Sequence, residues 1–225
     1  MPGIGKPPDR LLWITRTPPS ALAYSRRVEW DHLFDDLEGQ LASEWEAERA
    51  ALDAESERLR ISKLTLHDRL RALCGQASVV VLDLGDEHRL HATMRTIGAD
   101  WIAVTIRNDP RPLIVPIAAI AGVGTDHGSL LGSLAETAEL SPLRARMDLG
   151  FVLRDLARRR TTVALAVRDG GLQHGTIDRA GADHLDIALH DAGEPRRTST
   201  VRGFRVVPFS SLRWIRAEQP GARLP

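Results

Sequence analysis

The sequence predicts an α+β protein in which a long N-terminal helix precedes two repeated modules, each made of a helix and a small β-barrel. The first observation is an internal repeat: Leu66 to Ile106 aligns with Leu149 to Leu189 without a gap, at an offset of 83 residues. After a longer loop the repeat continues, because residues 114–123 (IVPIAAIAGV) align with residues 206–215 (VVPFSSLRWI) at an offset of 92. The second observation is the alternation of apolar and polar residues in short segments of both copies, which is typical of strands. The third is an acidic segment near the N-terminus whose apolar residues recur at helical spacing.

Changes in composition divide the chain into six expected segments. Residues 1–27 contain five prolines and little periodicity, which is typical of a disordered leader. We then expect an acidic amphipathic helix in 28–61, a first module in 62–124, a linker in 125–140, a second module in 141–217 and a tail in 218–225.

The composition also indicates in which cellular compartment the protein is expected. The chain has 225 residues, a formal net charge of zero and one cysteine, Cys74. A single cysteine excludes an intramolecular disulfide and favours a reducing compartment, so we expect a cytoplasmic protein with a small, buried thiol. No segment approaches the roughly 20 apolar residues of a membrane span, and Leu11 to Ile14 is too short for a signal peptide. We therefore expect no association with a membrane.

The acidic helix carries a candidate protein-interaction surface. Six apolar residues recur at steps of three and four and so share one helix face: Trp30, Leu33, Phe34, Leu37, Leu41 and Trp45. Residues 29–60 contain eleven acidic and three basic side chains. Two interpretations stay open. The face binds a second copy or another protein, or it covers the modules of its own chain.

Each module should begin with a helix. Thr65 followed by Asp68 resembles an acidic capping box, which predicts a short helix through Leu73. In the second copy, Ser141 and Pro142 offer an N-cap and a first-turn proline, so we expect one helix from there to Arg160.

Four strand segments should follow each helix. They are residues 79–84, 89–97, 101–106 and 113–123 in the first module, and residues 162–167, 172–180, 184–189 and 204–215 in the second. The alternation places the aligned His91 and His174 on the outer side, where a structural hydrogen bond is their expected role. Gly181, between two strands, predicts a turn with a positive φ.

This pattern resembles the Sm-like and wider SH3-like small barrels. The residues that carry the resemblance are Gly175-Thr176-Ile177, Gly181-Ala182-Asp183, Leu185, Ile187 and Val207-Pro208. The resemblance implies two barrels with a tendency to assemble, and a short helical turn in the V-P-x-x-x-[IL] element between the last two strands. The acidic helix followed by two such modules also looks like a set of actinobacterial proteins.

The resemblance does not extend to the RNA-binding residues of the Sm-like family. Sm-like proteins commonly bind RNA through a stacking aromatic residue and an Asn, followed later by an R-G turn. The stretch from Gly181 to His184 has no Asn, and neither V-P element contains R-G. Base recognition of the Sm type is therefore not carried over to this chain.

The long loop of the second module is a candidate nucleic-acid surface. It combines arginines, which suit phosphate contacts, with an aromatic ring that suits base stacking: Arg196, Arg197, Arg202, Phe204 and Arg205. Residues 141–225 contain fifteen basic and nine acidic side chains, so this half of the chain is basic.

Motifs of known catalytic chemistry are missing from the sequence. It has no Gly-x-Ser-x-Gly, no phosphate-binding loop, and no His and Cys set at zinc spacing, so we expect no enzyme activity, cofactor or metal. Our first hypothesis is a protein-interaction or scaffold protein that binds a protein partner or itself through the N-terminal helix. The second is an accessory or regulatory protein that binds RNA or DNA through the basic second half.

Overall fold

The structure, a computed structural model, describes residues 21–85, 89–107, 109–135, 142–168 and 171–218. The expected leader before residue 21 and the expected tail after residue 218 lie outside these ranges. The chain divides into two compact units, residues 1–62 and 63–225, and each is treated by itself below.

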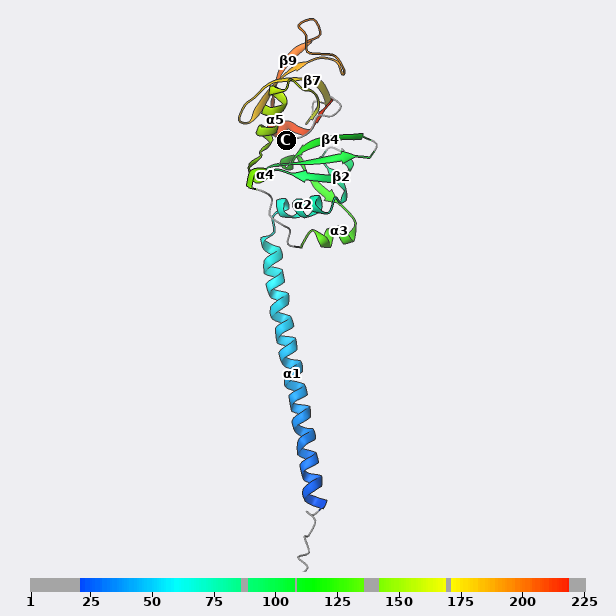
Figure 1. Ribbon diagram of the computed structural model, residues 1–225, viewed down its shortest axis with the longest axis vertical. Coiled ribbons are helices and arrows are strands. Elements are labelled where there is room, and N and C mark those ends of the chain that lie inside the picture. The colour runs from blue at the N-terminus through cyan, green and yellow to red at the C-terminus, as the bar shows by residue number, and fades with distance from the viewer. Residues whose placement is uncertain (1–20, 86–88, 108, 136–141, 169–170, 219–225) are drawn as a thin grey trace, which may run out of the picture. The chain divides into compact units, whose positions relative to one another are not determined.

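The first unit contains the predicted long helix. Helix α1 (Ala21–Lys63) is continuous over 43 residues (Figure 1), so Gly39 does not end it. The helix begins seven residues before the predicted start at residue 28, because residues 21–27 (ALAYSRR) contain good helix formers and no proline. Part of the expected leader is therefore helical.

The second unit begins with the predicted capped helix, α2 (Leu66–Gly75). The Thr65 hydroxyl accepts a 3.1 Å hydrogen bond from the backbone N–H of Asp68. The Asp68 carboxylate in turn accepts a 3.1 Å bond from the backbone N–H of Thr65. This reciprocal pair satisfies two N–H groups that the first helical turn leaves without intrahelical partners, and it confirms the capping box.

The helical region of the second copy differs from the prediction of one helix. Two helices are present, α4 (Pro142–Arg146) and α5 (Leu149–Arg158). Asp148 lies between them in extended conformation and caps α5 by accepting a 2.6 Å hydrogen bond from the N–H of Phe151. An aspartate in this position starts a new helix rather than continuing the old one. The segment expected to be a linker also contains a helix, α3 (His127–Gly132), capped by Asp126.

The described residues contain two sets of five strands. The first half of the unit contains β1 (Val79–Asp83), β2 (Arg89–Ile97), β3 (Trp101–Ile106), β4 (Asp109–Pro116) and β5 (Gly122–Gly124). The second half contains β6 (Thr162–Val167), β7 (Gly171–Ala180), β8 (His184–Leu189), β9 (Gly203–Pro208) and β10 (Leu212–Ala217). A single turn of 3₁₀ helix follows each Val-Pro pair, η1 (Ile117–Ala119) after Pro116 and η2 (Phe209–Ser211) after Pro208.

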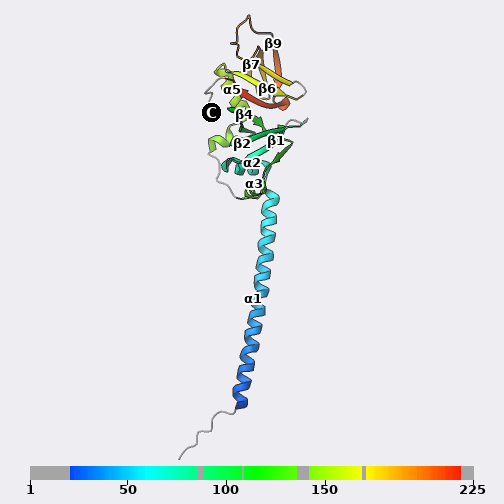
Figure 2. The same cartoon turned by 90° about the vertical axis from the view of Figure 1, so that its right-hand side faces the viewer.

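All ten strands belong to one antiparallel sheet, with the order β5-β1-β2-β3-β4-β10-β6-β7-β8-β9. The expected pair of separate closed barrels is therefore not confirmed, because the sheet does not close and it runs from one half into the other. In the views of Figures 1 and 2 the second half, with β7 and β9, lies above the first half, with β2 and β4. The connection is the pairing of β4 with β10, in which Ile114 lies opposite Ile215 and Leu113 lies opposite Arg216.

The two halves nevertheless repeat each other strand by strand. In the first half Leu82 pairs with Val123, and in the second half Leu165 pairs with Ile215. Likewise Ala103 pairs with Ile114, as Asp186 pairs with Val206. These pairs are related by the offsets of 83 and 92 residues, so the sequence repeat is also a repeat of strand register.

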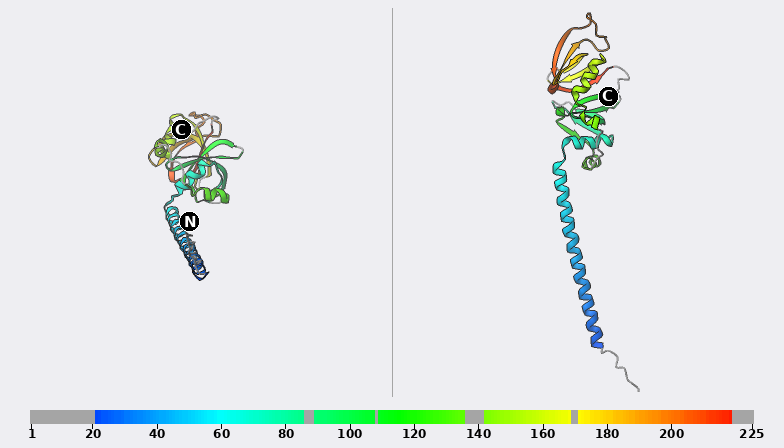
Figure 3. Two further views of the ribbon diagram at one scale, coloured as in Figure 1. Left: turned by 60° about the horizontal axis from the view of Figure 1, so that its bottom comes forward. Right: turned by 60° about the vertical axis from the view of Figure 1, so that its left-hand side comes forward.

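Each half has its own apolar core, and the first half contributes to both. Helix α2 packs on β2, and α5 packs on β7, as the right-hand view of Figure 3 shows for α5. The core of the second half also includes three buried side chains from β3 and β4 of the first half: Trp101, Ala103 and Ile114. This shared core explains why residues 63–225 form a single compact unit.

Gly181 does not have the positive φ that we predicted; the glycines with positive φ in the described part of the chain are Gly85, Gly171 and Gly193. A Cβ atom at Gly181 would instead lie 2.7 Å from Cε1 of the His184 ring. The position therefore needs a small residue because a side chain packs on it, not because of its backbone conformation.

Candidate functional site

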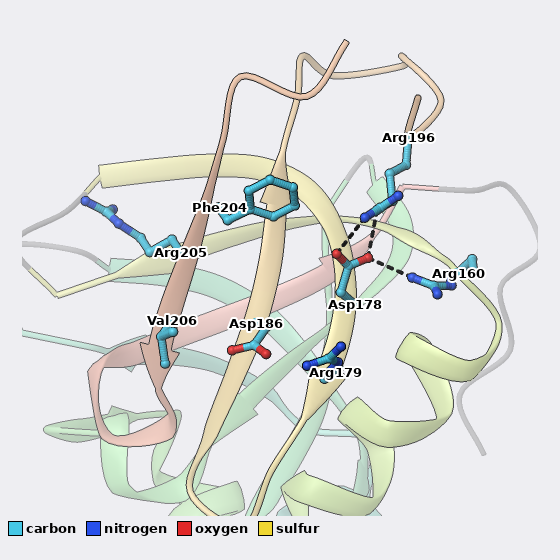
Figure 4. A pocket seen from close by; sticks show the side chains of 8 residues that line it. All are labelled: Arg160, Asp178, Arg179, Asp186, Arg196, Phe204, Arg205 and Val206. Carbon is cyan, nitrogen blue, oxygen red and sulfur yellow. Dashed lines mark hydrogen bonds and ion pairs between the residues drawn. The ribbon is translucent and has the colours of Figure 1, made fainter. Parts of the chain in front are cut away.

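A polar pocket of about 470 Å³ opens on β7, β8 and β9 of the second half. Its lining combines four arginines, two aspartates and two apolar side chains (Figure 4): Arg160, Asp178, Arg179, Asp186, Arg196, Phe204, Arg205 and Val206. We call it the arginine pocket. Three of the five residues predicted from the sequence to bind nucleic acid line it, namely Arg196, Phe204 and Arg205.

One wall of the pocket is a three-residue ion-pair cluster. Arg196 donates two hydrogen bonds to the Asp178 carboxylate, from Nε to Oδ1 at 2.7 Å and from Nη2 to Oδ2 at 2.8 Å. Arg160 reaches the same carboxylate from the end of α5, with its Nη1 2.7 Å from Oδ1. Figure 4 shows both guanidinium groups converging on Asp178. The cluster keeps one excess positive charge, but much of its hydrogen-bonding capacity is already used.

The other charged groups of the pocket are less engaged. Arg205 points away from Asp178 in Figure 4, and no ion pair holds it within the described residues. Arg179 likewise forms no ion pair with the residues that the structure describes. Beside them, the side chains of Phe204 and Val206 on β9 are 73% and 64% exposed. A lining that contains an aromatic ring and two arginines without ion pairs suits a planar anionic ligand.

The remaining two predicted residues lie outside the pocket lining. Arg202 forms an ion pair with Asp191. Arg197 takes part in a turn, in which its backbone N–H donates to the Thr200 hydroxyl over 3.1 Å. Sequence reasoning missed Arg160, Asp178 and Arg179, because they come from a helix end and from the middle strand of the half. The available signal was their charge, on β7 for Asp178 and Arg179 and just after α5 for Arg160.

Within its own unit, the apolar face predicted on α1 is exposed. The exposed fractions of five of its side chains range from 44% for Leu37 to 69% for Trp45. The same holds for Leu52 and Leu59, which continue the stripe at seven-residue spacing. Trp30 lies within α1, but its side chain is outside the description. Exposed apolar stripes of this length are uncommon on proteins and usually mark an interaction surface.

The aligned histidines have different surroundings. His174 Nδ1 lies 2.6 Å from a carboxylate oxygen of Glu218, and this pair supports the predicted structural hydrogen bond. Its counterpart His91 is exposed and lines an open depression of about 880 Å³ with Thr93, Arg95 and Thr105. His190 is fully buried and pairs with the Thr176 hydroxyl at 2.9 Å. The Thr176–His190 pair places a hydroxyl beside an imidazole, but the two residues are 1% and 0% exposed, so a substrate has no access to the hydroxyl.

Within the described residues, no three His, Cys, Asp or Glu side chains gather in a way that would hold a metal ion. The helices within the same ranges are all too short or too polar to cross a bilayer.

No family model, no curated protein and no solved structure matches the chain.

Proposed function

We propose that the protein is a non-enzymatic scaffold that associates through α1, and that the occupant of the apolar face of α1 is the same helix of a second copy. The observation that carries the proposal is the exposure of Leu33, Leu37, Leu41 and Trp45 on one helix face within its own unit. Burial of such side chains contributes roughly 25 cal/mol per Å² of apolar surface removed from water, so leaving them in water is costly.

The charge of the helix sets the conditions of association. With eleven acidic and three basic side chains, residues 29–60 carry a net charge of −8, and two copies repel each other. Salt screens this repulsion, with a Debye length of about 10 Å at 0.1 M, while apolar burial persists. Association through α1 should therefore strengthen as salt is raised, which is the opposite of an ion-paired interface.

We further propose that each half of the sheet is a strongly curved, barrel-like module of the Sm-like or SH3-like type. The strand order within each half supports this, because the last strand pairs with the first in both, β5 with β1 and β10 with β6. The 3₁₀ turn after each Val-Pro pair is a second supporting feature. In this arrangement the modules form the rigid body of the scaffold and α1 its contact arm.

Sedimentation equilibrium of the full chain tests the scaffold proposal. We expect a concentration-dependent oligomer whose dissociation constant falls between about 50 mM and 500 mM salt, as screening reduces repulsion. Leu37→Glu with Leu41→Glu should weaken association at least tenfold, since tenfold corresponds to only about 1.4 kcal/mol. The matched control is Ser43→Glu with Ala50→Glu, which adds the same charge on the opposite helix face.

A monomer at every salt concentration would refute self-association. Equal weakening by both double variants would show that charge, not the apolar face, controls assembly. If the chain is monomeric but binds another protein through Leu37 and Leu41, the scaffold function stands with a different occupant.

Nucleic-acid binding is the second candidate function, favoured by the arginine pocket. The probe is a labelled single-stranded RNA, followed by fluorescence anisotropy at about 50 mM salt, where phosphate contacts are least screened. Arg179→Ala and Arg205→Ala should each reduce the slope of log affinity against log salt by about 0.7 per lost contact. Phe204→Ala should cost about 1–3 kcal/mol with little change in slope. Arg58→Ala, on exposed α1, is the control, and an absence of binding by the unmodified protein removes this candidate.

A further inference from the structure

The two edges of the ten-stranded sheet have a defined relation to its centre. Strands β4 and β10 pair at the centre, and β5 and β9 are the outer strands. By the offset of 92 residues, β5 is the counterpart of β10, and β9 is the counterpart of β4. The edge strand β9 therefore corresponds to β4, and the edge strand β5 corresponds to β10. Strands β4 and β10 already pair with each other within one chain.

We propose that β9 of one chain pairs with β5 of a second copy and so repeats, between chains, the junction that β4 and β10 form within one chain. The register follows from the internal junction. There Ile114 lies opposite Ile215 and Leu113 lies opposite Arg216. The offset of 92 converts these pairs to Val206 opposite Val123 and Arg205 opposite Gly124.

The exposed side chains on β9 fit this role. Ile114 is 1% exposed at the junction, whereas its counterpart Val206 is 64% exposed. Phe204, on the same strand, is also exposed. An unpaired edge strand with exposed apolar residues is a template for pairing with another chain, and proteins usually cover or interrupt such edges.

The first half also retains the groove that would receive the partner. At the internal junction, Trp101, Ala103 and Ile114 enter the core built by α5 and β10. Six members of that core have counterparts that line a single cavity of about 190 Å³ between α2 and β5. The counterparts are Leu66, Arg69, Leu70, Leu73, Ile120 and Val123. Leu130 and Ser133, in and just after α3, form its far wall.

Charge differences between the halves select β5 over a second β9 as the partner. At the positions aligned with Trp101 and Ala103, the second half has His184 and Asp186. At the position aligned with Val152, the first half has Arg69, which lines the groove. The guanidinium of Arg69 donates to neutral acceptors only within the described residues, the Ser133 hydroxyl at 2.8 Å and the Leu130 carbonyl at 3.2 Å. It is thus available to the incoming Asp186. Pairing of β9 with another β9 would instead bring two Arg205 side chains together.

This contact is head-to-tail, because each chain offers one β9 edge and one β5 edge. Such an interface builds a ring when the rotation between copies closes, and an open filament when it does not. Since polar residues replace apolar ones on the β9 side, we expect it to be weaker than the internal junction and reversible. It is separate from the association through α1.

Cross-linking of the full chain tests the proposal, with Cys74→Ala as the background. Val206→Cys and Val123→Cys are placed in separate chains, which are mixed and treated with diamide. Because opposed strand residues have Cβ atoms within about 5.5 Å, we expect a disulfide-linked dimer containing one of each chain as the main product. Phe204→Cys with Val123→Cys is the control; it is out of register by two residues, about 6.6 Å along the strand, and should lose the cross-link.

Three results would overturn the proposal. The first is a folded mixture, judged by circular dichroism, that gives no cross-link. The second is efficient cross-linking of Val206→Cys with itself, which would show that two β9 edges pair. The third is loss of the mixed cross-link when Leu37→Glu and Leu41→Glu are added, since the edge contact would then depend on α1.

Discussion

The indole Nε1 of Trp101 donates a 2.9 Å hydrogen bond to the backbone carbonyl oxygen of Met147, so the β2–β3 turn of the first half is held against the start of α5. The backbone N–H of Ala99 donates to the same carbonyl at 3.0 Å. Close by, the Asp100 carboxylate accepts a 2.7 Å hydrogen bond from the N–H of Leu149. Polar contacts thus surround the apolar junction between the halves.

Trp101→Phe should destabilise the unit while keeping an aromatic ring in the junction. Trp101 is buried, and its replacement removes the indole donor. We expect a loss of about 1–3 kcal/mol, because the smaller ring leaves a cavity in the junction and one hydrogen bond is lost, while the Met147 carbonyl keeps its bond from Ala99. Urea denaturation measures it. The control is Trp45→Phe on exposed α1, and equal midpoints for Trp101→Phe and the unmodified protein would contradict the role of this bond.

Gly98 and Gly181 are aligned positions that should respond differently to alanine. A Cβ atom at Gly98 would lie 2.3 Å from Nε1 of Trp101 and 2.7 Å from the Met147 carbonyl oxygen. Both neighbours are fixed in the junction, so Gly98→Ala should cost about 1–3 kcal/mol by overpacking. At Gly181 the neighbour is the half-exposed His184 ring, which can rotate away, so Gly181→Ala should cost less. Thermal unfolding compares the two, and a larger effect at Gly181 would contradict this explanation.

Asp109 should contribute to a pH-dependent stability of the sheet centre. A hydrogen bond from the Arg111 guanidinium, with a further contribution from the charge of Arg216, lowers the pKa of Asp109 from 3.8 to about 2. Arg216 lies on β10, with its Nη1 2.9 Å from Asp109 Oδ2 on β4. Because the folded-state pKa is the lower one, this stabilisation is complete above about pH 4 and is lost as the pH falls toward about 2.

Asp109→Asn should therefore lower Tm at pH 7, and the Tm difference from the unmodified protein should shrink between about pH 4 and about pH 2. Asp53→Asn, an exposed carboxylate of α1, controls for the general effect of losing a charge. A Tm difference that stays constant across this range would exclude a role for Asp109 ionisation.

Cys74 should react slowly in the folded protein. Burial raises the pKa of its thiol to about 12, so very little thiolate is present at pH 8. Alkylation by iodoacetamide, followed by mass spectrometry, should be at least about 100-fold slower than in urea, because the thiolate is the nucleophile and a free thiol has a pKa near 8.5. Similar rates in both conditions would mean that the α2 end opens readily.

Short-range signals made several elements predictable from the sequence. The capping box of Thr65 and Asp68 and the helical spacing from Leu33 to Trp45 act within a few residues, and both are present as expected. The arginine pocket was accessible only in part. Arg196, Phe204 and Arg205 share one loop and strand, whereas Asp178 reaches them only through the pairing of β7 with β8 and of β8 with β9.

The α+β class, the long acidic helix and the repeat of strand register can be predicted from the linear chain, because offsets and periodicities are properties of the order of residues. That the repeats share one sheet depends on contacts between distant residues and is seen in the fold alone. Two closed barrels would need the same edges of β4 and β10 that pair with each other in this sheet. The same local sequence pattern is therefore compatible with either arrangement. The outcome depends on whether Trp101 and Ile114 are buried against α5 and β10, a contact between residues far apart in the chain.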